Sequence, residues 1–312
     1  MRWKWKARLQ NLIARLPSSV SYAVYYWLQR NFGGLRHPNP VSRLTAGVRT
    51  WKRIQQNGGV PQGKVFFEVG TGRDPLVPLA FWLMGAEKTI SVDLNPYLKE
   101  ELILESLDYI SENRSEIQQL FGDLLDQNRL DQLLEFNRTA DRSAADMLRL
   151  CRIEYQAPAD AAHTDLADES IDFHTSYTVF EHIPAEILRQ ILEEGNRITR
   201  ADGMFVHRID YSDHFSHSDP NICSINFLQY GDAQWDKIAG NRYMYMNRLR
   251  HDDVVALFES SGQCIVDASP DIDPRAQQAL QQGLLSLDDR FQSKTPDTLS
   301  ITGAWMVTRR CD

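Results

Sequence analysis

The stretch VFFEVGTGRDP, from Val65 to Pro75, decides how the rest of the sequence is interpreted. Its first residues form a short apolar run that predicts a buried strand. Gly70-Thr71-Gly72 then allows a tight turn and lets a ligand approach the bare backbone. Asp74 is a good helix N-cap, Pro75 is expected at the first helical position, and apolar residues follow at helical spacing. This order predicts the nucleotide-binding corner of a doubly wound α/β domain.

The charge distribution along the chain is uneven. Of the 312 residues, 42% are hydrophobic and 24% are charged, as in a globular protein. Residues 1–67 contain twelve Lys/Arg and no Asp or Glu, whereas the rest holds the other 22 basic residues and all 42 acidic ones. A basic leader on an acidic body predicts either docking onto an anionic surface or an intramolecular clasp.

The spacing of the four cysteines and the hydropathy of the sequence indicate the cellular compartment of the protein. Cys151, Cys223, Cys264 and Cys311 lie far apart and form no CxxC pair. We therefore expect neither a disulfide nor a zinc site. We also expect a cytoplasmic protein, since the cytoplasm is reducing. No apolar run reaches the roughly 18–20 residues of a membrane-spanning helix.

Residues 1–60 are expected to form a basic, amphipathic helical extension of a domain that covers residues 61–312. Trp5, Leu9, Leu12, Ile13 and Leu16 follow helical spacing, with basic residues mostly elsewhere on the wheel. A helix of this kind can lie in a bilayer interface, which predicts peripheral membrane contact through residues 1–30. Packing of the helices on the domain, as a lid or dimer arm, is the alternative.

After the opening stretch, strand and helix patterns alternate and predict a mainly parallel sheet. The expected strands are Thr89–Val92, Arg152–Tyr155, Ser170–Thr175, Gly203–Ile209, Cys264–Ala268 and Ile301–Thr308. An acidic helical stretch at about 111–150 is too long for an ordinary crossover. We interpret it as an insertion, either a cap over the site or a structural elaboration.

Three observations narrow the choice of nucleotide. Asp93 follows a predicted strand about twenty residues after the glycine turn, where ribose hydroxyls are held in this architecture. Pro75 occupies the third position of the GxGxxG pattern, which argues against a nicotinamide enzyme. The turn is not followed by the Walker lysine and serine of nucleotide triphosphatases.

Four motifs in order, EVGTGRDP, VDLNPY, DAAHTDL and SIDFHTSYTVFEHI, resemble those of class I S-adenosylmethionine-dependent methyltransferases that act on small molecules. The resemblance covers about residues 65–308 apart from the insertion. It implies S-adenosylmethionine as cofactor and a Rossmann-like, seven-stranded sheet whose last strand runs antiparallel beside the sixth. The family usually has a third glycine near Asp74, so this loop's detailed path is in question.

The resemblance also implies roles for individual residues. The glycine loop holds the methionine part of the cofactor, Asp93 binds the ribose, Asp160 and Ala161 meet the adenine amino group, and Tyr177 lies beside the sulfonium. The full set of expected cofactor residues is Glu68, Gly70, Thr71, Gly72, Asp93, Leu94, Asp160, Ala161 and Tyr177.

The acceptor is expected to be a small molecule, methylated at oxygen in preference to nitrogen or carbon. A hydroxyl acceptor needs a general base as well as alignment with the methyl group. The catalytic candidates are His182, His214 and Tyr177, with Glu181 beside them. Support of the loop is the alternative role for His182. His214-x-x-His217 with Asp210 and Asp213 is an alternative metal cluster, but no metal is expected, since spacing on a loop is weak evidence.

The stretch Asn226–Arg250 mixes aromatic residues with a few polar ones, as a pocket for a small organic acceptor does. A structural helix pair is the alternative. No nucleic-acid partner is expected, because the acidic body repels a phosphate backbone. Binding of RNA by the basic leader is the alternative. Two rival functions remain: a membrane-docked, non-catalytic binding protein of this fold, and a methyltransferase for a lipid-linked acceptor.

Overall fold

Seven strands form one mixed sheet in the computed structural model, which describes residues 2–311. The strand order is β3-β2-β1-β4-β5-β7-β6. Strands β1 to β5 pair in parallel, and β7 lies antiparallel between β5 and β6. The strands are β1 (Val65–Val69), β2 (Lys88–Val92), β3 (Ile153–Gln156), β4 (Ile171–Tyr177), β5 (Thr199–Asp210), β6 (Gln263–Ile272) and β7 (Ile301–Arg310). The predicted doubly wound sheet with an antiparallel last strand is confirmed.

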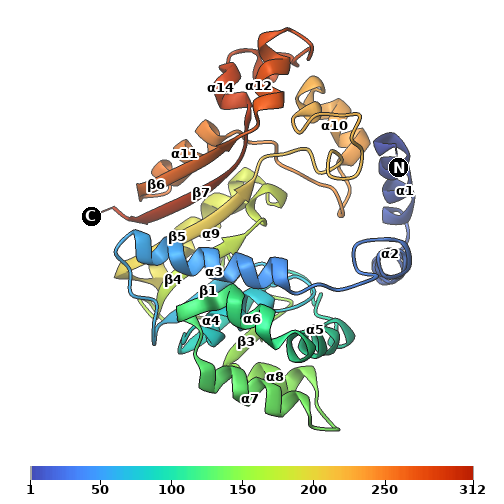
Figure 1. Ribbon diagram of the computed structural model, residues 1–312. Coiled ribbons are helices and arrows are strands. Elements are labelled where there is room, and N and C mark those ends of the chain that lie inside the picture. The colour runs from blue at the N-terminus through green and yellow to red at the C-terminus, as the bar shows by residue number, and fades with distance from the viewer. Residues whose placement is uncertain (1, 312) are drawn as a thin grey trace.

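Helices cover both faces of the sheet (Figure 1). One face packs against α3 (Val41–Gln56), α4 (Leu76–Leu83) and α5 (Glu100–Glu112), and the other against α9 (Ala185–Ile198) and α11 (His251–Ser260). The two adjacent phenylalanines of β1 show why: Phe66 belongs to the first core and Phe67 to the second, because successive strand residues point to opposite faces. Both side chains are fully buried.

The insertion extends the first helix layer. It comprises α6 (Arg114–Phe121), η1 (Gly122–Leu124), α7 (Gln127–Asn137) and α8 (Ala144–Leu150). Its apolar residues join the core of α4 and α5, and Arg129 donates hydrogen bonds to the carbonyls of Trp82 (2.7 Å) and Ala86 (2.6 Å). Figure 1 shows α7 and α8 at the end of the molecule remote from α1 and α10. The structure therefore supports a structural elaboration of the helix layer and not a cap over the glycine loop.

The helices α1 (Trp3–Ala14) and α2 (Ser18–Phe32) pack on the body. Trp3 of α1 lies against Phe215 and Trp235, in a third, smaller core. That core is completed by η3 (Asn226–Gln229), α10 (Asp232–Ala239), α12 (Pro274–Gln281), α13 (Asp289–Gln292) and α14 (Pro296–Leu299). Arg30 of α2 also forms an ion pair with Glu105 of α5, so the leader clasps the acidic body. Within residues 2–311, no helix has both the length and the apolar character needed to cross a membrane.

The prediction that the cysteines form no disulfide is wrong. Cys264 and Cys311 are bonded, with their Cα atoms 5.2 Å apart, although 47 positions separate them in the sequence. Cys264 lies at the start of β6 and Cys311 directly follows β7, so the antiparallel pairing of these strands brings the two together. The cysteines therefore give no support to a reducing compartment. Cys151 and Cys223 are free.

Candidate active site

The glycine loop follows β1 at the point where the strand order reverses between β1 and β4, which is where ligands bind in such sheets. Gly70 and Gly72 have φ angles of 87° and 75°, in the left-handed region. A Cβ on Gly70 would lie 2.5 Å from Cγ2 of Val179, whereas a Cβ on Gly72 would meet no atom within 4 Å. Gly70 is thus needed for packing against the segment after β4, and Gly72 leaves open space for a ligand.

The start of α4 differs by one position from the prediction. The helix begins at Leu76, and Pro75 is its N-cap in place of Asp74. Burial raises the pKa of the Asp74 carboxyl group.

A buried polar chain lies beneath the loop. Ser91 of β2 donates to Oε2 of Glu68 at 2.5 Å, and the hydroxyls of Thr71 and Ser91 are 2.7 Å apart. Burial raises the pKa of Glu68 to about 8. These contacts support the loop from below. Ser91 is a supporting residue that the motifs did not predict, since it lies within a strand.

Asp93 joins the end of β2 to the glycine loop. Its Oδ2 accepts a hydrogen bond of 2.9 Å from the Gly72 amide, and its Oδ1 one of 3.2 Å from the Asn95 amide. Burial raises the pKa of Asp93, against the effect of these hydrogen bonds. The next residue, Leu94, exposes 69% of its surface. Such an uncovered apolar side chain beside a carboxylate suits a nucleoside.

Asp160 and Ala161 lie in the loop after β3. This loop is joined to β2 by a hydrogen bond of 3.0 Å from the amide of Ala159 to the carbonyl of Asp93. Oδ1 of Asp160 accepts from the Ala162 amide at 2.9 Å, and about half of its side chain is exposed. Ala161 is buried. The structure thus places the loops that carry Asp93 and Asp160 side by side.

These residues fit S-adenosylmethionine, because the open cradle at Gly72, the carboxylate of Asp93 and the exposed Leu94 adjoin one another. The loop around Gly72 would hold its methionine part, Asp93 its ribose and Leu94 with Asp160 its adenine. When bound, this cofactor supplies a methyl group on a positively charged sulfur.

Arg73 and helix α2 are features that the motifs did not predict. The Arg73 guanidinium carbon lies 5.1 Å from the ring centroid of Tyr26, and its buried Nη1 has no hydrogen-bond partner within residues 2–311. A cavity of about 200 Å³ lies here, lined by Tyr22, Tyr26, Arg73, Asn95, Tyr97 and others. The tyrosine-rich sequence of α2 was the available signal, because it placed aromatic rings in a segment that ends up beside the glycine loop.

Tyr177 is the last residue of β4, two positions beyond the end of the predicted strand. Its ring meets that of Trp305 edge-on, with centroids 5.8 Å apart. Thr178 follows with a φ of 54°, which turns the chain sharply after the strand. The structure places Tyr177 at the reversal point of the sheet, partly buried against the α3–α4 core.

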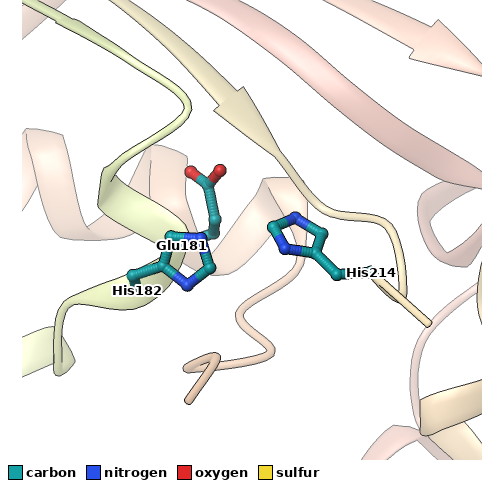
Figure 2. Close-up of side chains that lie close together, drawn as sticks. All are labelled: Glu181, His182 and His214. Carbon is teal, nitrogen blue, oxygen red and sulfur yellow. The ribbon is translucent and has the colours of Figure 1, made fainter. Parts of the chain in front are cut away.

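His182 and His214 are brought together with Glu181 (Figure 2). Glu181 and His182 lie in η2 (Phe180–His182) after β4, and His214 lies in the loop after β5. One donor atom from each of the three lies within 4.8 Å of the others. We call Glu181, His182 and His214 the acceptor-side cluster. It is formed by two segments that are some thirty residues apart in the sequence.

The metal cluster considered from spacing is only partly formed. Oδ2 of Asp210 lies 3.4 Å from Nε2 of His214 and 3.9 Å from Nε2 of His217. Asp213 instead accepts from the amide of Phe215 and the side chain of Asn226. Burial alone would raise the pKa of Asp210, but His214 and Ser212 lower it to about 2. The group that spacing missed is Glu181.

Hydrogen bonds hold the acceptor-side cluster in place. Nδ1 of His182 donates to the Tyr245 carbonyl at 2.8 Å, which leaves its Nε2 free as an acceptor. Burial lowers the pKa of His182, as does its neighbour His214. Glu181 is 2% exposed, and burial raises its pKa to about 8. His207 is fully buried in β5, with its Nδ1 2.8 Å from the Ser176 hydroxyl, so its role is structural.

A cavity of about 470 Å³ adjoins the cluster through Tyr245 and Asn247, which both line it. Its other lining residues include Asp232, Trp235, Arg248 and Arg290. The stretch 226–250 folds into η3, α10 and an irregular segment, so the alternative of a helix pair is wrong. Aromatic walls with a few polar groups are typical of a pocket for a small organic molecule.

Residues 132–207 match a family model described as a methyltransferase domain. The matched segment includes β3, β4, α9 and most of β5, and with them Asp160, Tyr177 and His182. The glycine loop and Asp93 lie outside it. No curated protein matches the chain.

Three solved structures illustrate the likeness in shape. A S-adenosylmethionine-dependent methyltransferase from Methanosarcina mazei is 12% identical, with 83% of this chain and 97% of that chain covered and a TM-score of 0.44. One from Mesorhizobium loti is 12% identical, with 85% and 100% covered and a TM-score of 0.45. The 1,6-didemethyltoxoflavin-N1-methyltransferase of Burkholderia thailandensis is 11% identical, with 95% and 89% covered and a TM-score of 0.45. At these TM-scores, the likeness gives no information about the fold beyond the strand order already observed.

Proposed function

We propose that this chain, a class I S-adenosylmethionine-dependent methyltransferase, methylates an oxygen atom of a small organic molecule. The class rests on the methyltransferase-domain match and the sheet order with β7 between β5 and β6. The acceptor and the methylated atom are the new parts of the proposal.

The observation that supports methylation at oxygen is the acceptor-side cluster, which is hydrogen-bonded to Tyr245 and Asn247, two residues that line the 470 Å³ cavity. A hydroxyl group must lose its proton as the methyl group arrives, so the enzyme needs groups that promote this loss. Glu181, His182 and His214 follow the carboxyl ends of β4 and β5, and we assign the cavity lined by Tyr245 and Asn247 to the acceptor. We assign loss of the acceptor's proton to this cluster.

Product analysis tests the proposal. The full chain is incubated with isotope-labelled S-adenosylmethionine and fractionated small-molecule and lipid extracts, and the labelled product is identified by mass spectrometry and NMR. A labelled methoxy group on a small molecule supports the proposal, and His182→Ala and His214→Ala should then lower kcat at least tenfold. Label on nitrogen or carbon contradicts the choice of oxygen, and label only in the lipid extract favours a lipid-linked acceptor.

We also propose that the leader docks on an anionic membrane surface. Helix α1 has two apolar faces: one packs inward through Trp3, Ala7 and Ile13, and the other points outward. The outward stripe, spaced as one helical face, is Trp5 (63% exposed), Leu9 (42%), Leu12 (64%) and Leu16 (38%). An exposed stripe of this kind marks an interaction surface.

The charges beside this stripe favour a membrane as its partner. Lys4, Arg8 and Arg15 flank it, and within residues 2–311 none of the three takes part in an ion pair. Basic residues and tryptophan around an apolar stripe are typical of helices that lie in the interface of anionic bilayers.

Vesicle flotation tests the docking. The full chain should float with phosphatidylserine-containing vesicles, and the double variant Trp5→Glu, Leu12→Glu should stay in the soluble fraction. Leu284→Glu is the matched control, because Leu284 is 71% exposed elsewhere on the molecule. Equal flotation of all three proteins, or none, contradicts docking through α1.

A further inference from the structure

We propose that Glu181, His182 and His214 bind a divalent transition-metal ion, such as Zn²⁺. This goes beyond the proposed methyl transfer, because it assigns a ligand to the chain's own side chains whether or not an acceptor is known. Two imidazoles and one carboxylate, with a further position left for a small molecule, form a donor set that zinc and related ions take in enzymes.

The unpaired carboxylate of Glu181 is the first observation that supports a cation. Both of its oxygens are buried and have no hydrogen-bond partner within residues 2–311. A buried carboxylate without partners costs free energy, and a bound cation removes that cost. Nε2 of His214 is also buried, but it lies 3.4 Å from Oδ2 of Asp210 and has that carboxylate as its neighbour. The unpaired carboxylate of Glu181 is therefore the feature of the cluster that calls for a cation.

The second observation is how His182 is held. Its Nδ1 donates to the carbonyl of Tyr245, so its electron pair for a metal is on Nε2. Metal-binding histidines commonly donate their other ring nitrogen to a carbonyl or carboxylate in this way. The same stretch of chain fixes η2 from the other side. The Asn247 amide donates to the Glu181 carbonyl at 2.9 Å, and the Asn247 side chain to the carbonyls of Phe180 and Ile183, both at 2.8 Å.

The spacing of the donors is compatible with binding. One atom of each residue lies within 4.8 Å of the others, and donors bonded to a tetrahedral zinc at about 2.1 Å lie about 3.4 Å apart. A closing movement of at most about 1.4 Å between donors completes the site. Figure 2 shows Glu181 and His182 on one segment, with His214 opposite them on another. Asp210, 3.4 Å from Nε2 of His214, stands behind this ligand.

A cation here would also specify how the proposed methyl transfer proceeds, and this part rests on the proposed function. His182 and His214 would then hold the ion instead of taking a proton themselves. A hydroxyl oxygen in the remaining position becomes more acidic, and its proton passes to water. Binding itself does not depend on this role.

Metal titration of the full, untagged chain without S-adenosylmethionine tests the site. After dialysis against a chelator, the protein is titrated with Zn²⁺ in a calorimeter and with Co²⁺ in a spectrophotometer. We expect one ion per chain, with a visible Co²⁺ spectrum, and at least a hundredfold weaker binding for Glu181→Gln and His214→Ala. His37→Ala is the matched control, since His37 is exposed in the leader.

Three outcomes overturn the proposal: no stoichiometric binding of either ion, binding that both variants retain, or a preference for Mg²⁺ over Zn²⁺. If Glu181→Gln does not fold, His214→Ala gives the same answer, because His214 lies in a loop. Metal binding without methyl transfer would contradict the proposed function alone, and methyl transfer that chelators leave unchanged, without metal binding, would contradict this inference alone.

Discussion

The carboxylate of Asp93 accepts a hydrogen bond of 2.9 Å from the backbone amide of Gly72. This bond joins the carboxyl end of β2 to the glycine loop after β1, two segments that the parallel pairing of the strands places side by side. One oxygen thereby holds the loop, and the carboxylate remains beside the open space at Gly72. The shape of the loop and the carboxylate that we assign to the ribose thus depend on one side chain.

We predict that Asp93→Ala weakens S-adenosylmethionine binding by at least tenfold. Hydrogen bonds to a charged group contribute about 1.5–3 kcal/mol, and about 1.4 kcal/mol corresponds to a factor of ten in affinity. Isothermal titration calorimetry measures the change. Asp123→Ala is the control, as Asp123 is an exposed acid in the insertion. Unchanged affinity of Asp93→Ala would remove this residue from the cofactor site.

Gly70→Ala should destabilise the protein more than Gly72→Ala. Both glycines have a positive φ, which costs other residues about 1–2 kcal/mol, but only at Gly70 does the new methyl group meet Val179. Overpacking adds about 1–3 kcal/mol. Urea denaturation measures both variants, and Val179→Ala should restore part of the stability of Gly70→Ala. Equal losses for the two glycines would contradict the observed packing.

The stability of the protein should depend on pH through Glu68. Burial raises the pKa of Glu68 to about 8 from an ordinary value of 4.5. Between these values the unfolded chain has lost the proton that the folded chain keeps, so rising pH favours unfolding by at most about 1.4 kcal/mol per pH unit. Glu68→Gln removes this dependence. Its Tm relative to the parent chain should rise from pH 5 to pH 8, and a constant difference would contradict the raised pKa.

The bond between Cys264 and Cys311 should stabilise the β6–β7 edge of the sheet. Replacing both by serine is expected to lower the free energy of unfolding by about 2–4 kcal/mol. A reductant should lower the Tm of the parent chain and leave that of the double variant unchanged. The unfolded, unreduced chain should react with a thiol reagent at two cysteines, Cys151 and Cys223. Reaction at all four would show that the bond is absent.

Much of the architecture was predictable because strand and helix periods are local. The β7 strand was expected at Ile301–Thr308 and is observed at Ile301–Arg310. The sequence left a choice open where a local pattern has two tertiary outcomes. The stretch 111–150 has the helical pattern of either a cap or a layer, and only its packing against α4 and α5 distinguishes them.

By itself, the sequence determined the order of the strands along the chain, the glycine turn of Val65–Pro75 and the acid at position 93. The reason is that each of these is set by neighbouring residues. The tertiary structure alone decided which distant residues meet: Cys264 with Cys311, and Glu181 and His182 with His214. These contacts follow from the order and direction in which the strands pair. Strand pairing in turn depends on the burial of side chains over the whole sheet.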